Sequence, residues 1–333
     1  MRNGALLLLF GLTLGCAAGA GNPVAGVRAR SPALGQDGNT YLAYVVNQQS
    51  DEITVIDLSA LAVVGRVPTG RNPHEIAASP DGSRLYTSDE QGGTITVVDR
   101  ASLQVIARWS GGVAPHGIEV TADGAYLLVT NGPRGEVLVF DAHTGAEVRR
   151  IPAPLGAHVV HRSPDGARAY VTSTADPSLT VIDLLTLQPV RTIPMGPGAE
   201  GLGVSPDGRW AYVANRAGND VWVVDAAILE VVDRIAVHRE PIRVAFGPDG
   251  ALAYVSQIAG DRILAIDTAS RQIVAEYVAE SGPIGMAVSP DGRYLYAANI
   301  FSGSLSVIDL AGGEAIAHIP SGSGPDGIVL LPR

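Results

Sequence analysis

Three histidines at one spacing are the residues of this sequence best suited to chemistry. His74, His116 and His158 lie 42 residues apart, Glu200 continues the series at the next step, and Asp326 stands three steps further on. Neutral imidazole is a ligand for Zn, Cu, Fe or Ni, and a carboxylate either shares the metal or orients the imidazole. If the fold brings the five side chains together, they form a candidate site for a divalent metal such as zinc or copper.

A second group of charged residues lies at positions whose equivalents, 42 residues before or after, are mostly small or apolar. Glu119 and His161 occupy one such position in successive steps, and Arg162 interrupts the position after it. Glu75 and Arg243 interrupt another position that is otherwise Gly or Val. Buried charges are costly unless they are paired or wet, so we expect Glu119 to pair with His161 or Arg162. The group predicts either a charge network along a water-filled channel or an acid–base pair, which makes Glu119, His161 and Arg162 the catalytic candidates.

The spacing belongs to a repeat that runs along the chain without insertion. One aspartate series lies in "VID"-like segments, at Asp57, Asp99, Asp141, Asp183, Asp225, Asp267 and Asp309. Another lies in "SPDG"-like turns, at Asp81, Asp123, Asp165, Asp207, Asp249 and Asp291. Residues that recur in every copy are explained by the fold, and we expect these aspartates to accept backbone hydrogen bonds at turns.

Each repeat contains four short segments rich in β-branched residues, separated by Asp-Gly and Asn/Gly turns. In the repeat that begins at Glu200 we predict strands over 201–205, 210–214, 220–224 and 231–236. Four antiparallel strands in 40 to 45 residues are typical of a propeller blade. The sequence therefore predicts an all-β propeller built from 42-residue repeats.

The number of blades follows from the incomplete repeats at the two ends. Six complete repeats begin at residues 74, 116, 158, 200, 242 and 284. The segment 41–67 lacks a first strand, and residues 326–331 supply a lone first strand. Joining the two predicts a seventh blade that closes the ring and removes the exposed sheet edges.

The ring places the histidine series at the start of the innermost strands, around the mouth of the central channel. The remaining two members of the series are Ile242 and Ile284. Besides a metal site, the histidine series has two other possible interpretations. The side chains form a polar mouth without metal, or they pack against the next blade, because position 74 shares its strand face with Ile76 and Ala78.

Composition excludes several classes of function. The formal net charge is −10, the sequence contains no lysine, and no basic run is present, so we expect no nucleic-acid partner and no electrostatic attachment to membranes. Without lysine there is no Schiff-base chemistry. The only cysteine is Cys16. No phosphate-binding loop, dinucleotide fingerprint, nucleophile elbow, HExxH or CxxCH motif occurs.

The N-terminus has the features of an export signal. Arg2 precedes an apolar run that is too short to span a bilayer, and "LTLGC" at 12–16 resembles a bacterial lipobox. We predict a signal peptide over 1–15, lipid on Cys16, a flexible tether over 16–39 and the propeller over 40–333. The product would be periplasmic or in the cell envelope, with the lipid as its only membrane attachment. Cleavage near 17–21, giving a soluble periplasmic or secreted protein, is the alternative.

"LLVTNG" (127–132), "AYVTST" (169–174) and "AYVANR" (211–216), together with the "SPDG" and "VID" segments, resemble the YVTN family of bacterial seven-bladed β-propellers. The resemblance implies the fold and leaves the function open. We expect a monomeric binding or scaffold protein that uses its channel mouth for a small molecule or an envelope protein, and no cofactor. The alternative is a metal-binding protein or metalloenzyme, a lyase, hydrolase or copper-linked oxidoreductase, that uses the histidine series.

Overall fold

A computed structural model describes residues 41–333 of the chain. The predicted signal peptide, the lipidated Cys16 and the tether lie outside the described residues. Within residues 41–333 no helix is long and apolar enough to cross a membrane. The single helical element of this part is a 3₁₀ turn, η1 (Gly132–Arg134).

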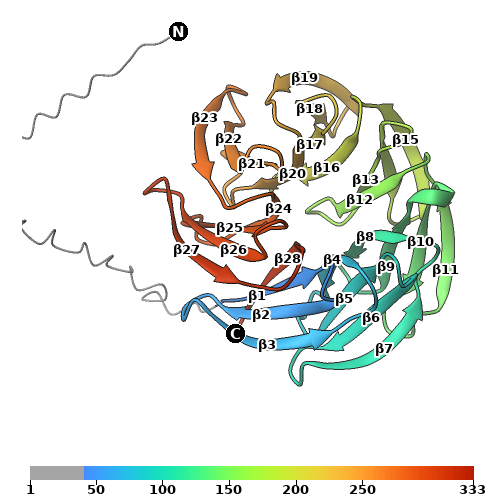
Figure 1. The fold of residues 1–333 in the computed structure, drawn as a ribbon. Helices are drawn as coiled ribbons and strands as arrows, with labels where there is room; N and C mark the ends of the chain where they lie inside the picture. Colours follow the sequence, from blue (N-terminus) through green and yellow to red (C-terminus); the bar gives the residue numbers. More distant parts are fainter. Residues whose placement is uncertain (1–40) are drawn as a thin grey trace, which may run out of the picture. The chain divides into compact units, whose positions relative to one another are not determined.

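The described chain forms seven antiparallel sheets of four strands each, arranged around a central axis (Figure 1). Blade one contains β4 (Pro73–Ala78), β5 (Arg84–Asp89), β6 (Thr94–Asp99) and β7 (Gln104–Ser110). Blade two contains β8 (Pro115–Val120), β9 (Tyr126–Asn131), β10 (Glu136–Asp141) and β11 (Glu147–Pro152). Blade three contains β12 (Ala157–Arg162), β13 (Arg168–Ser173), β14 (Ser178–Asp183) and β15 (Gln188–Pro194).

The remaining blades follow the same order from the inner strand outward. Blade four contains β16 (Ala199–Val204), β17 (Trp210–Asn215), β18 (Asp220–Asp225) and β19 (Glu230–Ala236). Blade five contains β20 (Pro241–Phe246), β21 (Leu252–Gln257), β22 (Arg262–Asp267) and β23 (Ile273–Val278). Blade six contains β24 (Pro283–Val288), β25 (Tyr294–Asn299), β26 (Ser304–Asp309) and β27 (Glu314–Pro320). Blade seven contains β28 (Pro325–Pro332), β1 (Tyr41–Asn47), β2 (Glu52–Asp57) and β3 (Ala62–Pro68).

Blade seven combines the two ends of the described chain. The C-terminal strand β28 pairs antiparallel with β1, with Ala43 opposite Leu330 and Tyr44 opposite Val329, and it becomes the innermost strand of that blade. The predicted seven-bladed ring, closed by the C-terminal strand, is confirmed. The strands of the repeat at Glu200 also agree with the prediction to within two residues.

The two aspartate series have the structural role expected of them. In the tight turn after β4, the Asp81 carboxylate accepts a hydrogen bond from the backbone N–H of Ser83 at 3.0 Å. At the end of β2, the Asp57 carboxylate accepts from the backbone N–H of Ser59 at 2.9 Å. Gly82 has φ +68°, which glycine adopts without strain. These turns fix the strand order of each blade.

The hydrophobic core lies between neighbouring blades. One cluster joins Tyr170 of blade three to Leu202 and Val213 of blade four, all buried. The Tyr86 hydroxyl donates to the Ala142 carbonyl of the next blade at 2.9 Å, which satisfies its polar end. Each large apolar side chain buried in this way contributes about 1.5–3 kcal/mol, so every blade depends on its neighbours for stability.

Candidate functional site at the channel mouth

A β-bulge at the start of each inner strand directs the histidine series toward the channel mouth. In blade one Pro73 lies opposite Asp89 and Glu75 lies opposite Ser88, so His74 has no partner in the ladder. The inner strands of the other blades show a register shift at the corresponding place. A bulge breaks the alternation of side chains along a strand. His74 therefore does not have to share the face of Ile76 and Ala78, which was the reason for expecting packing against the next blade.

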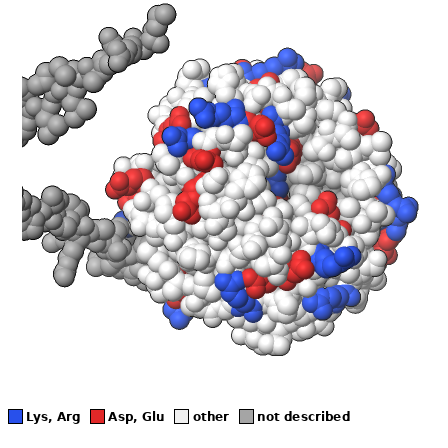
Figure 2. Space-filling view, in the orientation of Figure 1, with Lys and Arg blue, Asp and Glu red and all other residues white. Residues whose placement is uncertain are grey.

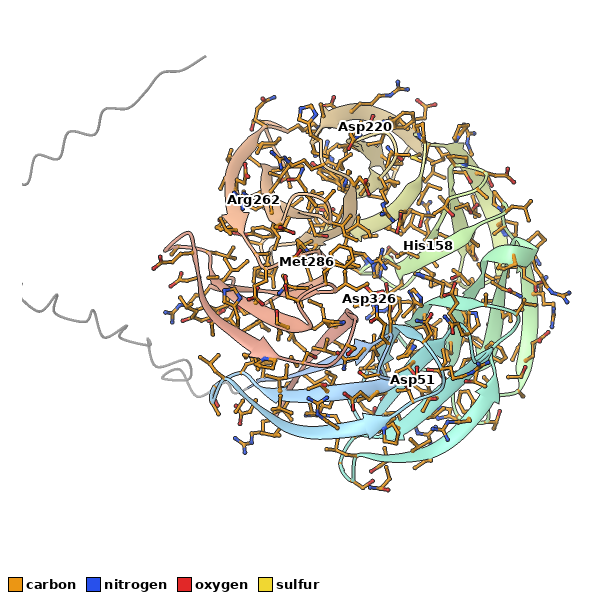
Figure 3. The ribbon with its side chains drawn as sticks, in the orientation of Figure 1. Asp51, His158, Asp220, Arg262, Met286 and Asp326 are labelled. Atoms are coloured by element: carbon orange, nitrogen blue, oxygen red, sulfur yellow. The ribbon has the colours of Figure 1, made fainter. Side chains whose placement is uncertain are left out.

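Seven residues in equivalent positions form a ring at this mouth, one from each blade; we call them the mouth ring. In order around the channel they are Asp326, His74, His116, His158, Glu200, Ile242 and Ile284. The first five form a polar arc, and the two isoleucines form an apolar arc that is buried against Ile258. His158 and Asp326 lie toward the middle of the propeller, whereas Arg262 and Asp220 lie further out (Figure 3).

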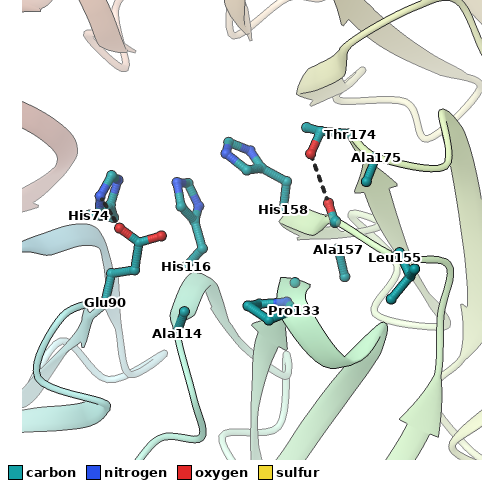
Figure 4. Close-up of a pocket in the computed structure, with 12 residues that line it drawn as sticks. His74, Glu90, Ala114, His116, Pro133, Leu155, Ala157, His158, Thr174 and Ala175 are labelled. Atoms are coloured by element: carbon teal, nitrogen blue, oxygen red, sulfur yellow. Dashed lines mark hydrogen bonds and ion pairs between the residues drawn. The ribbon is translucent and has the colours of Figure 1, made fainter.

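The three imidazoles of the mouth ring stand in a row. The ring centroids of His74 and His116 are 4.4 Å apart, and those of His116 and His158 are 3.7 Å apart. The row borders a cavity of about 490 Å³, whose other walls include Pro133, Leu155 and Ala157 (Figure 4). Five of its twelve lining residues have polar side chains, and the others are small or apolar: the five are His74, Glu90, His116, His158 and Thr174. A small number of polar groups among mainly apolar walls is typical of a small-molecule site.

His74 differs from the other two histidines because carboxylates surround it. Its Nε2 lies 3.0 Å from the Glu90 carboxylate, and its Nδ1 lies 3.4 Å from the Asp326 carboxylate. Gln48 supports this arrangement by donating to the same oxygen of Asp326 at 2.7 Å. Burial alone would lower the pKa of His74, but the two carboxylates outweigh burial and raise it to about 9. His74 is therefore an imidazolium at neutral pH.

His116 and His158 are neutral at the same pH. Burial, reinforced by the neighbouring imidazoles, lowers the pKa of His116 well below its usual value. Burial and the Arg243 guanidinium lower the pKa of His158 to about 3. The Nδ1 atoms of both rings are buried and make no hydrogen bond with residues 41–333. Because both Nδ1 atoms are covered by protein, a molecule in the cavity would contact other atoms of the two rings.

A second ring of side chains lies against the mouth ring; we call its members the partner positions. They come from the end of each second strand, and in the same blade order they are Gln48, Glu90, Gly132, Thr174, Arg216, Ile258 and Ile300. Five of the seven contact their mouth-ring neighbour: Gln48 and Glu90 as above, Arg216 at 3.7 Å from the Glu200 carboxylate, and the two isoleucines by apolar packing. Gly132 has no side chain, and Thr174 donates instead to the Gly156 carbonyl at 3.3 Å.

Glu75 and Arg243, which interrupt the same position in blades one and five, bind each other across the channel at 2.9 Å. Arg243 is buried and also lies 3.7 Å from Asp326. Burial raises the pKa of Glu75, and the Arg243 guanidinium opposes this effect. Removing one member of such a pair leaves a buried charge without compensation, at a cost of about 3–5 kcal/mol. Two opposite charges in one repeat position were a sequence signal for this pair.

Glu119, His161 and Arg162 lie together on the wall of the central channel. The Glu119 carboxylate is 3.3 Å from His161 Nδ1 and 3.3 Å from Arg162 Nε, so the expected pairing takes place with both residues. They border a separate cavity of about 360 Å³ that also contains Glu75 and Arg243. This cavity shares no lining residue with the cavity at the histidine row. The structure brings the catalytic candidates together, and a catalytic role for them stays a prediction.

The five residues predicted to hold a divalent metal all lie in the mouth ring. Among residues 41–333, however, no three His, Cys, Asp or Glu side chains are arranged to hold one metal ion. The imidazoles lie side by side, and His74 is occupied by its carboxylates. A metal at His74, His116, His158, Glu200 and Asp326 remains a prediction that would require the side chains to rearrange.

Charged side chains of both signs are interspersed on the surface, as Figure 2 shows for one face. Some charged groups near the mouth are paired, as Arg216 is with Glu240 at 2.9 Å. The fold and the mouth together define a class of protein: a seven-bladed β-propeller whose channel mouth has five polar residues and two isoleucines.

Comparison with known families gives a closer assignment. The sequence matches the family described as "Cytochrome D1 heme domain" over residues 37–159 and 154–244, which is more than half of the chain. The chain belongs to this family of cytochrome D1 haem-domain and YVTN-like propellers. Among curated proteins, none matches the sequence.

Similar solved structures share the fold at low sequence identity. Hydrazine synthase of Kuenenia stuttgartiensis is 23% identical with a TM-score of 0.71, over 78% of this chain and 95% of that one. A functionally unknown protein from Desulfotomaculum acetoxidans is 16% identical with a TM-score of 0.76, over 87% and 98%. Dihydro-heme d1 dehydrogenase NirN, in complex with DHE, is 21% identical with a TM-score of 0.66, over 86% and 74%.

The family name implies a haem, but the mouth does not fit one. An imidazole that ligates haem iron needs free space around its nitrogen for the macrocycle to lie across it. His116 is flanked on both sides, by His74 at 4.4 Å and His158 at 3.7 Å between centroids. His158 stands in the same row, with His116 against one side of it (Figure 4). We therefore derive no haem chemistry for this chain.

Proposed function

We propose that this protein is an exported, non-catalytic binding protein that takes a small molecule at the mouth of its channel. The observation that carries the proposal is the cavity of about 490 Å³ at the channel mouth, which the His116 and His158 imidazoles border together with mainly small and apolar side chains. In these two blades the partner positions are Gly132 and Thr174, so no long side chain fills the space beside the histidines. A small molecule could occupy that space and contact the imidazoles.

The test is whether the purified protein retains a small molecule from a cell extract. Purified mature protein would be incubated with the low-molecular-weight extract of the cells that produce it, passed through gel filtration and denatured, and the released molecules identified by mass spectrometry. We expect a molecule that is retained by the wild type and by the outer-strand control Thr192→Val, and lost by a His116→Ala, His158→Ala double variant. An identical set of molecules from all three proteins would reject the proposal.

Export and lipid anchoring at Cys16 are part of the same proposal and rest on the lipobox-like "LTLGC" segment. A lipid on Cys16 would hold the propeller at a membrane face of the cell envelope. Cys16→Ala should move the protein from the membrane fraction to the soluble fraction. A wild-type protein that is already soluble and lacks lipid would support the alternative of cleavage near residues 17–21.

A divalent metal is the second candidate, because His116 and His158 are neutral, as metal-ligating imidazoles must be. Elemental analysis and calorimetric titration with Zn²⁺ and Cu²⁺ would test it on the wild type and on His116→Ala. Stoichiometric metal whose affinity falls steeply in the variant would favour a metalloprotein. Equal weak binding in both proteins would remove this candidate.

A further inference from the structure

Five charged side chains at the channel mouth are joined in a series of ion pairs, which we call the ionic chain. It begins at Glu90, whose carboxylate lies 3.0 Å from His74 Nε2, and His74 Nδ1 lies 3.4 Å from Asp326. From Asp326 the ionic chain continues to Arg243 at 3.7 Å, and Arg243 lies 2.9 Å from Glu75. Negative and positive groups therefore alternate, and both ends are carboxylates.

Three carboxylates in the ionic chain share two cations, so its net charge is negative. The count takes His74 as an imidazolium. A neutral His74 would make the ionic chain more negative, so the sign does not depend on the protonation of this residue. Further along the mouth, the Arg216 guanidinium is likewise shared by two carboxylates, Glu200 at 3.7 Å and Glu240 at 2.9 Å. The ionic groups of the mouth therefore lack positive charge, which a cationic ligand would supply.

Glu90 is the more exposed end of the ionic chain. Its side chain is 36% exposed and lines the cavity of about 490 Å³, whereas the side chain of Glu75 is 19% exposed. The Oε2 atom of Glu90 faces His74, and its Oε1 atom makes no hydrogen bond or ion pair with residues 41–333. Figure 4 shows the carboxylate beside His74, with its second oxygen directed away from that ring. A bound molecule can therefore use Oε1 as a hydrogen-bond acceptor.

The other walls of the cavity favour an organic cation over a metal ion. Among residues 41–333, no arginine lines the cavity, and the sequence contains no lysine. Arg134 follows the lining residue Pro133 but is exposed and is not part of the wall. Leu155 and Ala157 add apolar surface, and no three metal-ligating side chains of this part of the protein are arranged around one point. One free carboxylate oxygen and apolar walls suit an ammonium group with an apolar body.

We propose that the cavity binds a small organic ammonium ion, whose N–H groups donate to Glu90 and whose apolar body lies against Pro133 and Leu155. The ion continues the alternation of charges beyond Glu90. The inference rests on the proposed function and adds the chemical class of the ligand. Binding transfers no proton and breaks no bond, since the amine is already protonated at pH 7, and neither His116 nor His158 gains or loses a proton.

The first test compares three probes of nearly equal size and shape: phenethylamine, a cation at pH 7, phenethyl alcohol, which is neutral, and phenylpropionate, an anion. Calorimetric titration of the full mature protein gives an affinity for each probe. We expect phenethylamine to bind about tenfold more tightly than phenethyl alcohol, because a charge-assisted hydrogen bond replaces a neutral one, and phenylpropionate to bind most weakly. If the alcohol or the acid bound as tightly as the amine, the ammonium class would be wrong, while a binding function would stand. If none of the three bound, the ammonium class would also be wrong, and the cell-extract experiment would still decide the proposed function.

The second test removes the charge of Glu90 with almost no change in side-chain size. In Glu90→Gln the affinity for phenethylamine should fall about tenfold, and the affinity for phenethyl alcohol should stay within about twofold of the wild type. Glu240→Gln is the matched control, because it removes the same charge from a mouth carboxylate that does not line the cavity. Its affinities should stay within about twofold. An unchanged affinity for phenethylamine in Glu90→Gln, or equal losses in the two variants, would overturn the contact with Glu90.

The position of the bound amine is measured in the wild type, so this readout does not depend on the folding of a variant. In NMR spectra of histidine-labelled protein at constant pH, phenethylamine should shift the ring signals of His116 and His158, because both rings line the cavity. The signals of His143 and His318, which do not line it, should stay in place. If only these two moved, or if no histidine signal moved, the amine would be bound elsewhere and the inference would be wrong.

Discussion

At the scale of single residues, histidines at equivalent repeat positions differ in charge, because different side chains lie beside them. His74 lies between the carboxylates of Glu90 and Asp326, whereas His116 and His158 contact each other and apolar walls. One row of imidazoles therefore begins with a cation and continues with two neutral rings. Stacking a neutral ring on an imidazolium is favourable, which helps to keep the row in place.

Replacing Glu90 by Gln should lower the pKa of His74 from about 9, because the variant removes one of the two carboxylates that hold the proton. Asp326 remains, so the pKa should stay above that of His116. Histidine NMR titration would measure the shift, and Glu240→Gln, which alters the partner of Arg216, is the control. An unchanged His74 pKa in Glu90→Gln would mean that Asp326 alone keeps His74 protonated.

The neutral histidines should make folding sensitive to acid. The folded-state pKa of His158 is about 3 and the unfolded value is near 6.5, so below pH 6.5 the unfolded chain binds a proton that the folded protein does not. Stability should therefore fall as the pH decreases from 6.5 toward 3, by at most about 1.4 kcal/mol per pH unit for this group.

His158→Gln should reduce that slope, whereas Val190→Thr, which exchanges one exposed side chain for another that does not ionise, should not. Urea unfolding at several pH values would give the free energy of unfolding for each protein. If the free energy of unfolding depended on pH equally in the wild type and in His158→Gln, His158 would be protonated in the folded state as easily as in the unfolded one.

At the scale of elements, a hydroxyl near the end of the second strand holds the mouth ring in position. The Thr130 hydroxyl donates to the His158 carbonyl of the next blade at 2.6 Å and accepts from the backbone N–H of Gly117 at 2.7 Å. Thr172 makes the same bond to the Glu200 carbonyl at 2.9 Å. The bulge leaves the Gly117 N–H without a ladder partner, and the threonine supplies one.

Thr130→Val should lower the free energy of unfolding by about 1–3 kcal/mol, because it removes a buried donor and acceptor while conserving the shape of the side chain. Val190→Thr, at a position of the outer strand β15 that is 53% exposed, is the control, and its effect should stay within about 0.5 kcal/mol. Urea unfolding monitored by tryptophan fluorescence would compare the two. If both variants were equally stable, the hydroxyl bridge would not contribute to holding β8 and β12 together.

At the scale of the whole molecule, closure of the ring depends on ten residues at the C-terminus. Strand β28 is the inner strand of blade seven, and it carries Asp326 into the mouth ring. Without it, β1 would have an unpaired edge facing the channel, and the Arg243 guanidinium would lose one of its two carboxylates.

Deletion of residues 324–333 should therefore abolish cooperative thermal unfolding or cause aggregation. Deletion of Arg333 alone is the control: its exposed guanidinium lies 2.9 Å from Asp57, whose buried carboxylate keeps its hydrogen bonds from Ser59 and Ala60, so the loss should be about 1 kcal/mol or less. Differential scanning calorimetry would record both transitions. A ten-residue deletion that melts like the full chain would be incompatible with closure by β28.

The fold and the blade count of this protein follow from its sequence. A 42-residue period without insertion, with turn residues and β-branched segments in one register, allows few arrangements, because strands of such repeats bury their apolar faces only against neighbouring copies. The same comparison of copies identified the mouth-ring series and the pairing of Glu119. It also indicated that the recurring aspartates are structural, since they appear in every repeat.

The arrangement and charge of the mouth residues depend on the tertiary structure. The bulge at His74 changes the direction of the side chain, and a bulge depends on pairing between strands rather than on the residues of one strand. The pairing of Glu75 with Arg243 requires two blades that face each other across the channel. The charge state of each histidine depends on burial and on neighbours such as Glu90. The side-chain direction, the ion pair and the histidine charge states all depend on which side chains lie close together in three dimensions. The repeat pattern of the sequence does not give those distances.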